Sequence, residues 1–193
     1  MPRVVSLLAS STETVYALGL GEHLVGRSHE CDYPPAVTQL PVCTEPKLPA
    51  DGTSYEIDQR IKAILQEGLS VYRVHADRLK ELAPDLIITQ VQCEVCAVSL
   101  RDVEDALCTW LGTRPRILAL APNALADIWR DMERIAEALG APERGTALVQ
   151  TLQRRMTAIA EKARSLPERP TVACIEWIDP LMAAGNWMPE LVE

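Results

Sequence analysis

The chain has 193 residues, of which 48% are hydrophobic and 24% are charged, as is ordinary for a globular protein. Its formal net charge of −8 argues against a nucleic-acid partner, because phosphate contacts need clustered Lys and Arg side chains. No apolar run approaches the roughly 20 residues that a membrane helix needs, so no transmembrane segment is expected.

The N-terminal residues Met1-Pro2-Arg3 lead directly into an apolar run. They lack the basic region, the longer apolar stretch and the small-residue cleavage site of a secretory signal. This predicts a cytoplasmic protein, or a periplasmic one if a signal was removed. In a reducing cytosol the 6 cysteines are expected as thiols or metal ligands rather than structural disulfides.

Short apolar runs alternate with helical patterns along the chain, which predicts an α/β fold with a parallel sheet. The first helix is expected to begin at a capping box made by Ser10 and Glu13 and to stop at Gly19. Residues 71–74 are expected as a short edge strand. The four main strands are predicted in the spatial order 2-1-3-4, at residues 4–8, 24–26, 85–89 and 116–120.

A long apolar stripe follows Pro142. From Glu143 to Leu166 it has few breakers, which predicts a helix about 35 Å long. A new strand is expected from Thr171 to Trp177. The predicted division is an N-terminal lobe (1–141), a long backbone helix (142–167) and the beginning of a truncated second lobe (168–193). So short a second lobe leaves apolar surface and a sheet edge uncovered, which predicts self-association or a disordered tail.

Several short segments carry a resemblance to a known family, and they are Arg3-Val4-Val5-Ser6-Leu7, Ser11-Thr12-Glu13, Tyr16-Ala17-Leu18-Gly19, Val25-Gly26, Asp32-Tyr33-Pro34-Pro35, Leu82-Ala83-Pro84-Asp85-Leu86-Ile87-Ile88, Asp179-Pro180-Leu181 and Gly185-Asn186. They resemble the cobalamin and ferric-siderophore receptors, which are the substrate-binding proteins of ABC importers. The resemblance implies two Rossmann-like lobes joined by one long helix, a corrinoid such as cobalamin or another metal chelate bound in the cleft between them, an ABC permease as partner, and no catalysis. The cysteine pair and an insertion near residues 51–74 are closer to a signal-less subgroup of cobalamin-binding proteins.

The loops that leave the strands contain the candidate ligand-binding residues, because open parallel sheets bind ligands outside the carboxyl ends of their strands. Aromatic side chains are suited to stacking on a planar macrocycle. The alternative for the two tryptophans is a packing role at the end of a core strand and at the lobe junction. The residues expected at the ligand are Ser10, Ser11, His29, Tyr33, Gln90, Gln92, Trp177 and Trp187.

A second hypothesis is a metal site in the same loops. His29, Cys31, Cys93 and Cys96 form a four-ligand set of the kind that zinc or iron prefers. This leaves open a cytoplasmic metalloprotein or metal-dependent enzyme. The sequence contains no Ser/His/Asp set, phosphate-binding loop or pair of catalytic carboxylates from which a reaction could be inferred. The alternatives are cysteines that pack as small hydrophobic residues and a loop histidine bonded to backbone. A dithiol redox role is disfavoured because Glu94 lies between the two later cysteines.

Overall fold

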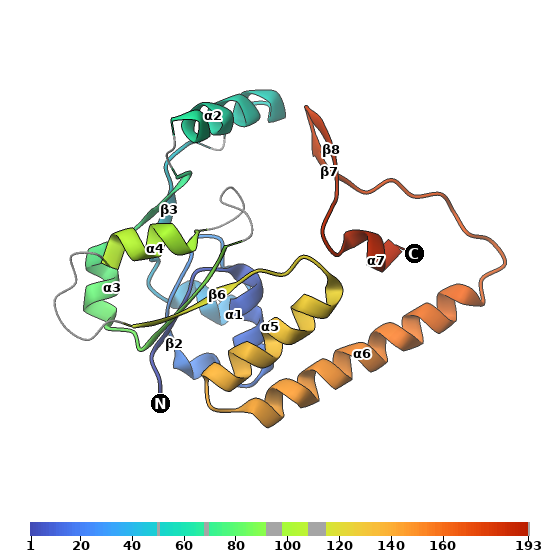
Figure 1. Cartoon of the computed structure of the whole chain (residues 1–193), viewed down its shortest axis with the longest axis horizontal. Coiled ribbons are helices and arrows are strands. Elements are labelled where there is room, and N and C mark those ends of the chain that lie inside the picture. The colour runs from blue at the N-terminus through green and yellow to red at the C-terminus, as the bar shows by residue number, and fades with distance from the viewer. Residues whose placement is uncertain (50, 68–69, 92–97, 108–114, 193) are drawn as a thin grey trace. The chain divides into compact units, whose positions relative to one another are not determined.

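The computed structural model describes residues 1–49, 51–67, 70–91, 98–107 and 115–192. The chain divides into two compact units, Met1–Ala121 and Pro122–Glu193, and each is described by itself (Figure 1). No helix in the described ranges is long and apolar enough to cross a membrane. The predicted boundaries of the lobes and the connecting helix stay a prediction.

The first unit is built on a parallel four-stranded sheet. Its strands are β1 (Val4–Ser6), β2 (Leu24–Arg27), β5 (Leu86–Gln90) and β6 (Arg116–Leu120), in the order β2-β1-β5-β6. Val4 of β1 pairs with Leu24 of β2 on one side and with Leu86 of β5 on the other. The predicted fold class and strand order are therefore confirmed. Parallel neighbours require a crossover between them, and the helices of the unit supply most of these crossovers.

The helical segments of the first unit are α1 (Ala9–Ala17), η1 (Gly21–His23), η2 (Pro35–Gln39), α2 (Ser54–Gln66), α3 (Ala76–Leu82) and α4 (Leu100–Leu107). The predicted capping box at the start of α1 is wrong. The N-cap is Leu8 and no side chain caps it, so Ser10 lies inside the helix. The predicted end of α1 is confirmed: Gly19 has a φ of 70°, a conformation that glycine adopts without strain.

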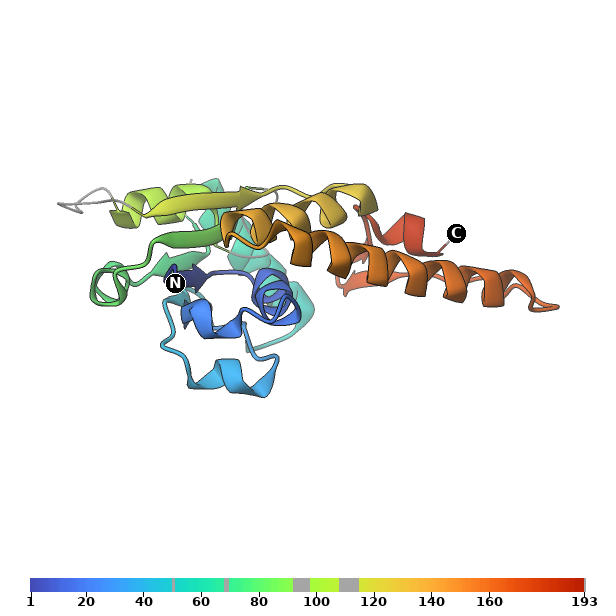
Figure 2. The same cartoon turned by 90° about the horizontal axis from the view of Figure 1, so that it is seen from below.

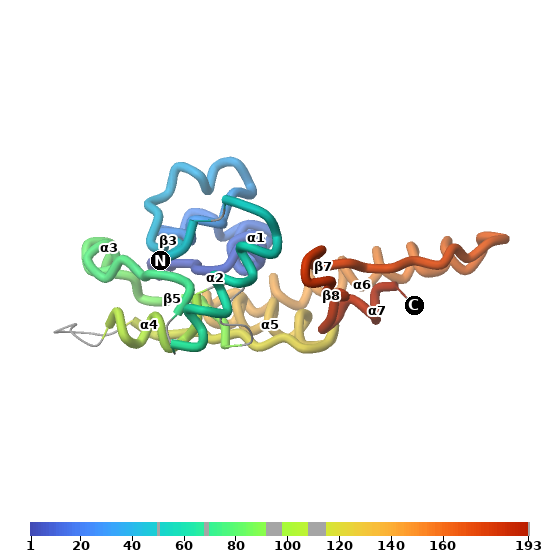
Figure 3. The backbone as a smooth tube through the Cα atoms, turned by 90° about the horizontal axis from the view of Figure 1, so that it is seen from above, coloured from blue at the N-terminus to red at the C-terminus, as the bar shows by residue number. Residues whose placement is uncertain are grey.

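A two-stranded ribbon carries α2 away from the sheet. It pairs β3 (Thr44–Pro46) antiparallel with β4 (Tyr72–Val74). The strand predicted at residues 71–74 therefore exists, but its partner is β3 and not the edge of the main sheet. The segment before β3 follows the outer edge of β2, where the Arg27 carbonyl accepts a hydrogen bond from the Cys43 N–H at 2.8 Å. Figure 3 shows the chain between β2 and β3 as a pale blue excursion beside α1.

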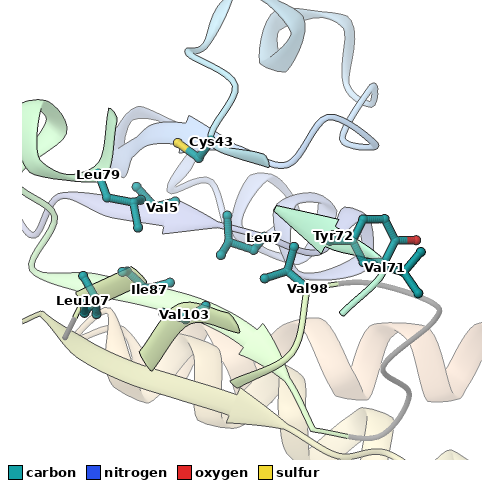
Figure 4. Close-up of a cluster of buried hydrophobic side chains, with 10 residues drawn as sticks. All are labelled: Val5, Leu7, Cys43, Val71, Tyr72, Leu79, Ile87, Val98, Val103 and Leu107. Carbon is teal, nitrogen blue, oxygen red and sulfur yellow. The ribbon is translucent and has the colours of Figure 1, made fainter. Parts of the chain in front are cut away.

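A cluster of buried hydrophobic side chains lies on one face of the sheet in the first unit (Figure 4). Val5 and Leu7 of β1 and the adjoining chain point to the same face as Ile87 of β5, and all three are fully buried. Helix α3 contributes Leu79 to this cluster, and α4 contributes Val103 and Leu107. Because side chains alternate along a strand, Ser6 points to the opposite face, where it meets α1.

The second unit begins with a helical hairpin. Helix α5 (Leu125–Ala138) is followed by α6 (Pro142–Arg164), and the two lie side by side (Figure 2). With 23 residues, α6 is about 35 Å long, so the predicted long helix is confirmed. The two helices approach closely at Gly145, where an added Cβ would lie 2.6 Å from Cβ of Ala136.

The end of the chain differs from the predicted strand at residues 171–177. The observed strand β7 (Ile175–Ile178) forms an antiparallel hairpin with β8 (Leu181–Ala183), and α7 (Met188–Val192) follows. The turn at Asp179-Pro180 returns the chain beside β7, so the segment is locally paired. Ile178 and Leu181 are each 72% exposed, and the predicted self-association stays a prediction.

Candidate ligand-binding site

Three neighbouring strands end at one edge of the first unit's sheet. Strands β2, β1 and β5 run parallel to one another, so their carboxyl ends lie at this same edge. Adjacent strands are about 4.8 Å apart, which puts the outer two about 10 Å from each other. This is the edge at which open parallel sheets bind ligands. We call it the carboxyl edge.

A tight turn from Ser28 to Cys31 presents His29 just beyond β2. The Cys31 N–H donates to the Ser28 carbonyl at 3.2 Å, and the Ser28 N–H donates to the Ser6 carbonyl of β1 at 3.0 Å. The Ser28 hydroxyl accepts the Glu30 N–H at 3.2 Å, a pattern common in turns that contain serine. The turn is therefore attached to the sheet and stabilised from within.

Arg27, the last residue of β2, fixes the longer loop around this turn. Its guanidinium donates to the carbonyls of Ser28 at 3.1 Å and Cys31 at 3.0 Å. It also donates to the carbonyls of Leu40 and Thr38, each at 3.3 Å. Four of its five N–H groups thus hold both ends of one loop, and no described carboxylate forms an ion pair with it.

The His29 ring is held in place by the ribbon. The Thr44 hydroxyl of β3 lies 2.8 Å from the His29 Nδ1 and accepts the His29 backbone N–H at 3.1 Å. The ring also packs against Tyr72 of β4, with centroids 5.5 Å apart and planes at 45°. Burial lowers the pKa of His29, although the nearby Glu30 carboxylate opposes that shift. The imidazole is thus favoured in its neutral form, in which a ring nitrogen can coordinate a metal.

With Nδ1 bonded to Thr44, Nε2 is the ring nitrogen of His29 that remains for a ligand. Within the described ranges no hydrogen bond to Nε2 is found, and the side chain is half-buried. A histidine whose Nδ1 is held by a protein oxygen is the usual arrangement for coordination through Nε2. The geometry therefore suits a ligand that offers a metal coordination position at the carboxyl edge.

Tyr72 and Thr44 were not predicted as site residues. Burial, together with the charge and the hydrogen bond of Glu30, raises the pKa of Tyr72 to about 12. The phenol is therefore neutral at physiological pH and bonds to a carboxylate on the same turn as His29. The sequence did predict a strand that contains Tyr72, but no sequence pattern indicated that this strand would lie beside His29.

Cys31 is buried against Thr12 of α1. The residue is 1% exposed, and its thiol accepts a hydrogen bond from the Thr12 hydroxyl at 3.2 Å. Burial raises the pKa of this thiol, which favours the protonated form over the thiolate that metals bind. In the described part of the chain, Cys31 therefore resembles a packed small side chain more than a metal ligand.

The predicted metal set remains untested. Cys93 and Cys96 lie outside the described residues, so their distance from His29 and Cys31 is not given by this structure. Among the residues that are described, no group of three or more His, Cys, Asp or Glu side chains is arranged to hold a metal ion. The zinc or iron site therefore stays a prediction.

The two serines of α1 have different environments. Ser10 is exposed, so its side chain is open to a ligand at the carboxyl edge. Ser11 is 1% exposed, and its hydroxyl lies 2.6 Å from the Ser6 hydroxyl and donates to the Leu8 carbonyl at 3.1 Å. The second serine thus contributes to the contact between β1 and α1.

The other predicted ligand residues fall into three groups. Tyr33 is 61% exposed and Gln90 is 8% exposed, both in the first unit, at the loop after β2 and the end of β5. Trp177 and Trp187 are half-buried residues of the second unit, and the Trp177 indole donates to a carbonyl of its own hairpin at 2.9 Å. Gln92 lies outside the described residues. Their roles at the ligand stay predictions.

Known proteins match this chain along most of its length. The model of the periplasmic binding protein family matches residues 4–193. An uncharacterized ABC transporter substrate-binding lipoprotein of Bacillus subtilis is 24% identical over 165 residues, which are 85% of this chain and 42% of that protein.

Two solved structures give the same fold. The apo periplasmic heme-binding protein RhuT of Roseiflexus sp. RS-1 is 25% identical with a TM-score of 0.61, over 90% of this chain and 54% of that one. The periplasmic vitamin B12-binding protein BtuF of Vibrio cholerae is 21% identical with a TM-score of 0.63, over 99% and 64%. The chain thus spans about half the length of these relatives.

Proposed function

Because the chain belongs to the periplasmic binding protein family, we propose that it binds a metal chelate at the carboxyl edge for uptake by an ABC permease. Two related structures are named for heme and for vitamin B12, which are both planar macrocycles around a metal. The members of this family are binding proteins and not enzymes, in agreement with the expectation that the chain catalyses no reaction. The proposed ligand is a corrinoid or a similar chelate.

The observation that carries the proposal is the neutral His29 imidazole at the tip of a fixed turn. Thr44 holds Nδ1, so Nε2 is directed by the protein before any ligand arrives. A preorganised ligand atom lowers the entropy cost of binding. Tyr33, exposed on the same loop, offers an aromatic face for the macrocycle.

The proposed location follows from the relatives. The family is one of periplasmic proteins, and the relative from Bacillus subtilis is a lipoprotein. The sequence predicted a cytoplasmic protein, or a periplasmic one if a signal was removed. We propose the second alternative, a location outside the cytoplasmic membrane. Accessibility of an introduced surface cysteine to a membrane-impermeant thiol reagent in intact cells tests this location.

The test of binding is a titration of the purified chain with aquocobinamide, hydroxocobalamin and hemin. Coordination by His29 shifts the visible absorption band of the chelate, and calorimetry gives its affinity. His29→Ala should abolish the shift. His75→Ala is the matched control, because His75 is a partly exposed histidine near Glu45 whose backbone N–H bonds to Cys43, and among the described residues no hydrogen bond joins it to the His29 turn. Absence of binding to every chelate in the panel would refute the proposed function.

A further inference from the structure

Glu30 is bonded to the tight turn and to the ribbon at the same time. Its backbone N–H donates to the Ser28 hydroxyl at 3.2 Å, and its side-chain carboxylate accepts a hydrogen bond from the Tyr72 phenol. A hydrogen bond to a carboxylate is stronger than one between two neutral groups. Glu30 therefore anchors a side chain of β4 to the turn that carries His29.

Tyr72 is placed against His29 by the register of the ribbon. Thr44 of β3 lies opposite Val74 of β4, so Tyr72, two residues before Val74, is on the same face of the ribbon as Thr44. The Tyr72 N–H donates to the Ser70 hydroxyl at 3.2 Å, which fixes the start of β4. Tyr72 is 8% exposed, and its ring lies at the edge of the buried cluster in Figure 4. Thr44 and Tyr72 thus approach the imidazole from the same face of the ribbon.

The contacts around His29 form a closed ring. The Thr44 hydroxyl lies 2.8 Å from Nδ1 of the imidazole and donates to the Ser28 hydroxyl at 3.3 Å. The Tyr72 ring packs against the imidazole, and Glu30 closes the ring because it bonds to both Ser28 and Tyr72. One hydrogen bond fixes one atom of the imidazole but leaves the ring free to tilt about it. The contact with Tyr72 is the one that fixes the plane of the ring.

We infer that Glu30 and Tyr72 form a brace that sets the plane of the His29 ring, and that both are positioning residues for coordination of a metal through Nε2. The inference rests on the proposed function, because it concerns how the same imidazole meets the chelate. A coordinate bond is directional, so a ring already held in one plane loses less freedom on binding than one that is free to tilt. The brace therefore contributes to affinity only for chelates whose metal can accept a nitrogen ligand.

A double-mutant cycle tests the brace in the full chain. Tyr72→Phe keeps the aromatic ring and removes the phenol oxygen, whereas Glu30→Ala removes the carboxylate from an exposed residue. Each should weaken the binding of aquocobinamide or hemin about 2–10 times, because one more side chain must be ordered on binding. The double variant should bind no more weakly than the weaker single variant, because both substitutions delete the same hydrogen bond.

A conservative variant and a matched control accompany the cycle. Glu30→Gln keeps an oxygen that can accept the phenol hydrogen, so it should restore part of the affinity that Glu30→Ala loses. Tyr16→Phe removes a phenol oxygen elsewhere in the first unit, from a half-buried tyrosine of α1 whose ring lies against Gly21. It should leave every affinity unchanged. Thermal unfolding followed by circular dichroism checks that all variants fold.

Chelates without an open coordination position separate positioning from a merely structural role. Dicyanocobinamide in excess cyanide has both axial positions of its cobalt filled, and protoporphyrin IX contains no metal. Neither can be coordinated by His29, so the affinity for each should be the same in the wild type, Tyr72→Phe and Glu30→Ala. A general loss of structure at the turn would instead weaken the binding of coordinating and non-coordinating chelates alike.

Three outcomes are distinguishable. Non-additive losses that are confined to the coordinating chelates and partly restored by Glu30→Gln support the inference. Unchanged affinities, additive losses, equal losses for both kinds of chelate, or a Glu30→Gln variant no better than Glu30→Ala overturn the inference and leave the proposed function standing. Failure of the wild type to bind aquocobinamide, hydroxocobalamin or hemin overturns the proposed function and this inference with it.

Discussion

Replacing Thr44 by valine tests whether the ribbon holds the His29 ring. The substitution keeps a β-branched side chain of similar size in a strand, so the main change is the loss of one hydroxyl. That hydroxyl is in a residue only 1% exposed. It lies 2.8 Å from the His29 Nδ1, accepts the His29 N–H at 3.1 Å and donates to the Ser28 hydroxyl at 3.3 Å.

The expected cost follows from these contacts. A buried polar group left without a partner costs about 1–3 kcal/mol. His29 is half-buried and its ring can turn toward water, so we expect Thr44→Val to lower the free energy of unfolding by about 1–2 kcal/mol. Thr44→Ser keeps the hydroxyl and should cost less through this route, which makes it the matched control.

A double-mutant cycle isolates the side-chain contact. Urea unfolding of Thr44→Val, His29→Ala and the double variant should give a coupling energy of about 0.5–1.5 kcal/mol. In the His29→Ala background, Thr44→Val still removes the bonds to the residue 29 N–H and the Ser28 hydroxyl but no longer removes a contact with the ring. The single Thr44→Val variant should also bind the chelate about 2–10 times more weakly, since ordering a free side chain costs about 0.5–1.5 kcal/mol. Additive effects with a coupling energy near zero would refute the anchoring role of Thr44.

Three further predictions concern other parts of the molecule. Gly145→Ala should lower the free energy of unfolding, measured in urea, by about 1–2 kcal/mol. Alanine has the better helix propensity, but overpacking against Ala136 costs about 1–3 kcal/mol, so adding Ala136→Gly should restore part of the lost stability. Burial raises the pKa of Cys43 to about 11, so peptide-resolved alkylation at pH 8 should label the half-buried Cys174 before Cys43. Equal alkylation rates at the two cysteines would contradict this. The pKa of Tyr72 is about 12 in the folded protein and near 10 in the unfolded chain, so the neutral phenol stabilises the fold below about pH 10 and this stabilisation is lost as the pH rises toward 12. The ultraviolet difference spectrum between the wild type and Tyr72→Phe should therefore show no tyrosinate at pH 10.

The parallel sheet and the long helix were predictable because their signals are local. Apolar runs bounded by turn residues locate the strands, and an unbroken apolar stripe locates α6. His29 was predictable as an edge residue for the same reason, since it follows a strand whose direction is set by the parallel order. The helix caps were less predictable. Glu13 makes no capping box, because the hydroxyls of Ser11 and Thr12 bond back to the Leu8 carbonyl and the helix begins at Ala9.

Tertiary structure decided which side chains surround His29. Thr44 and Tyr72 lie far from it along the chain and reach it only because β3 and β4 pair with each other beside β2, a long-range contact with no sequence period to reveal it. Cys31 lies in the interior against Thr12 of α1, where burial raises the pKa of its thiol although the hydrogen bond from the Thr12 hydroxyl acts in the opposite direction. Composition and spacing therefore determined the parallel sheet and the position of His29 just after β2, whereas the non-local packing of the ribbon determined which side chains hold the His29 ring.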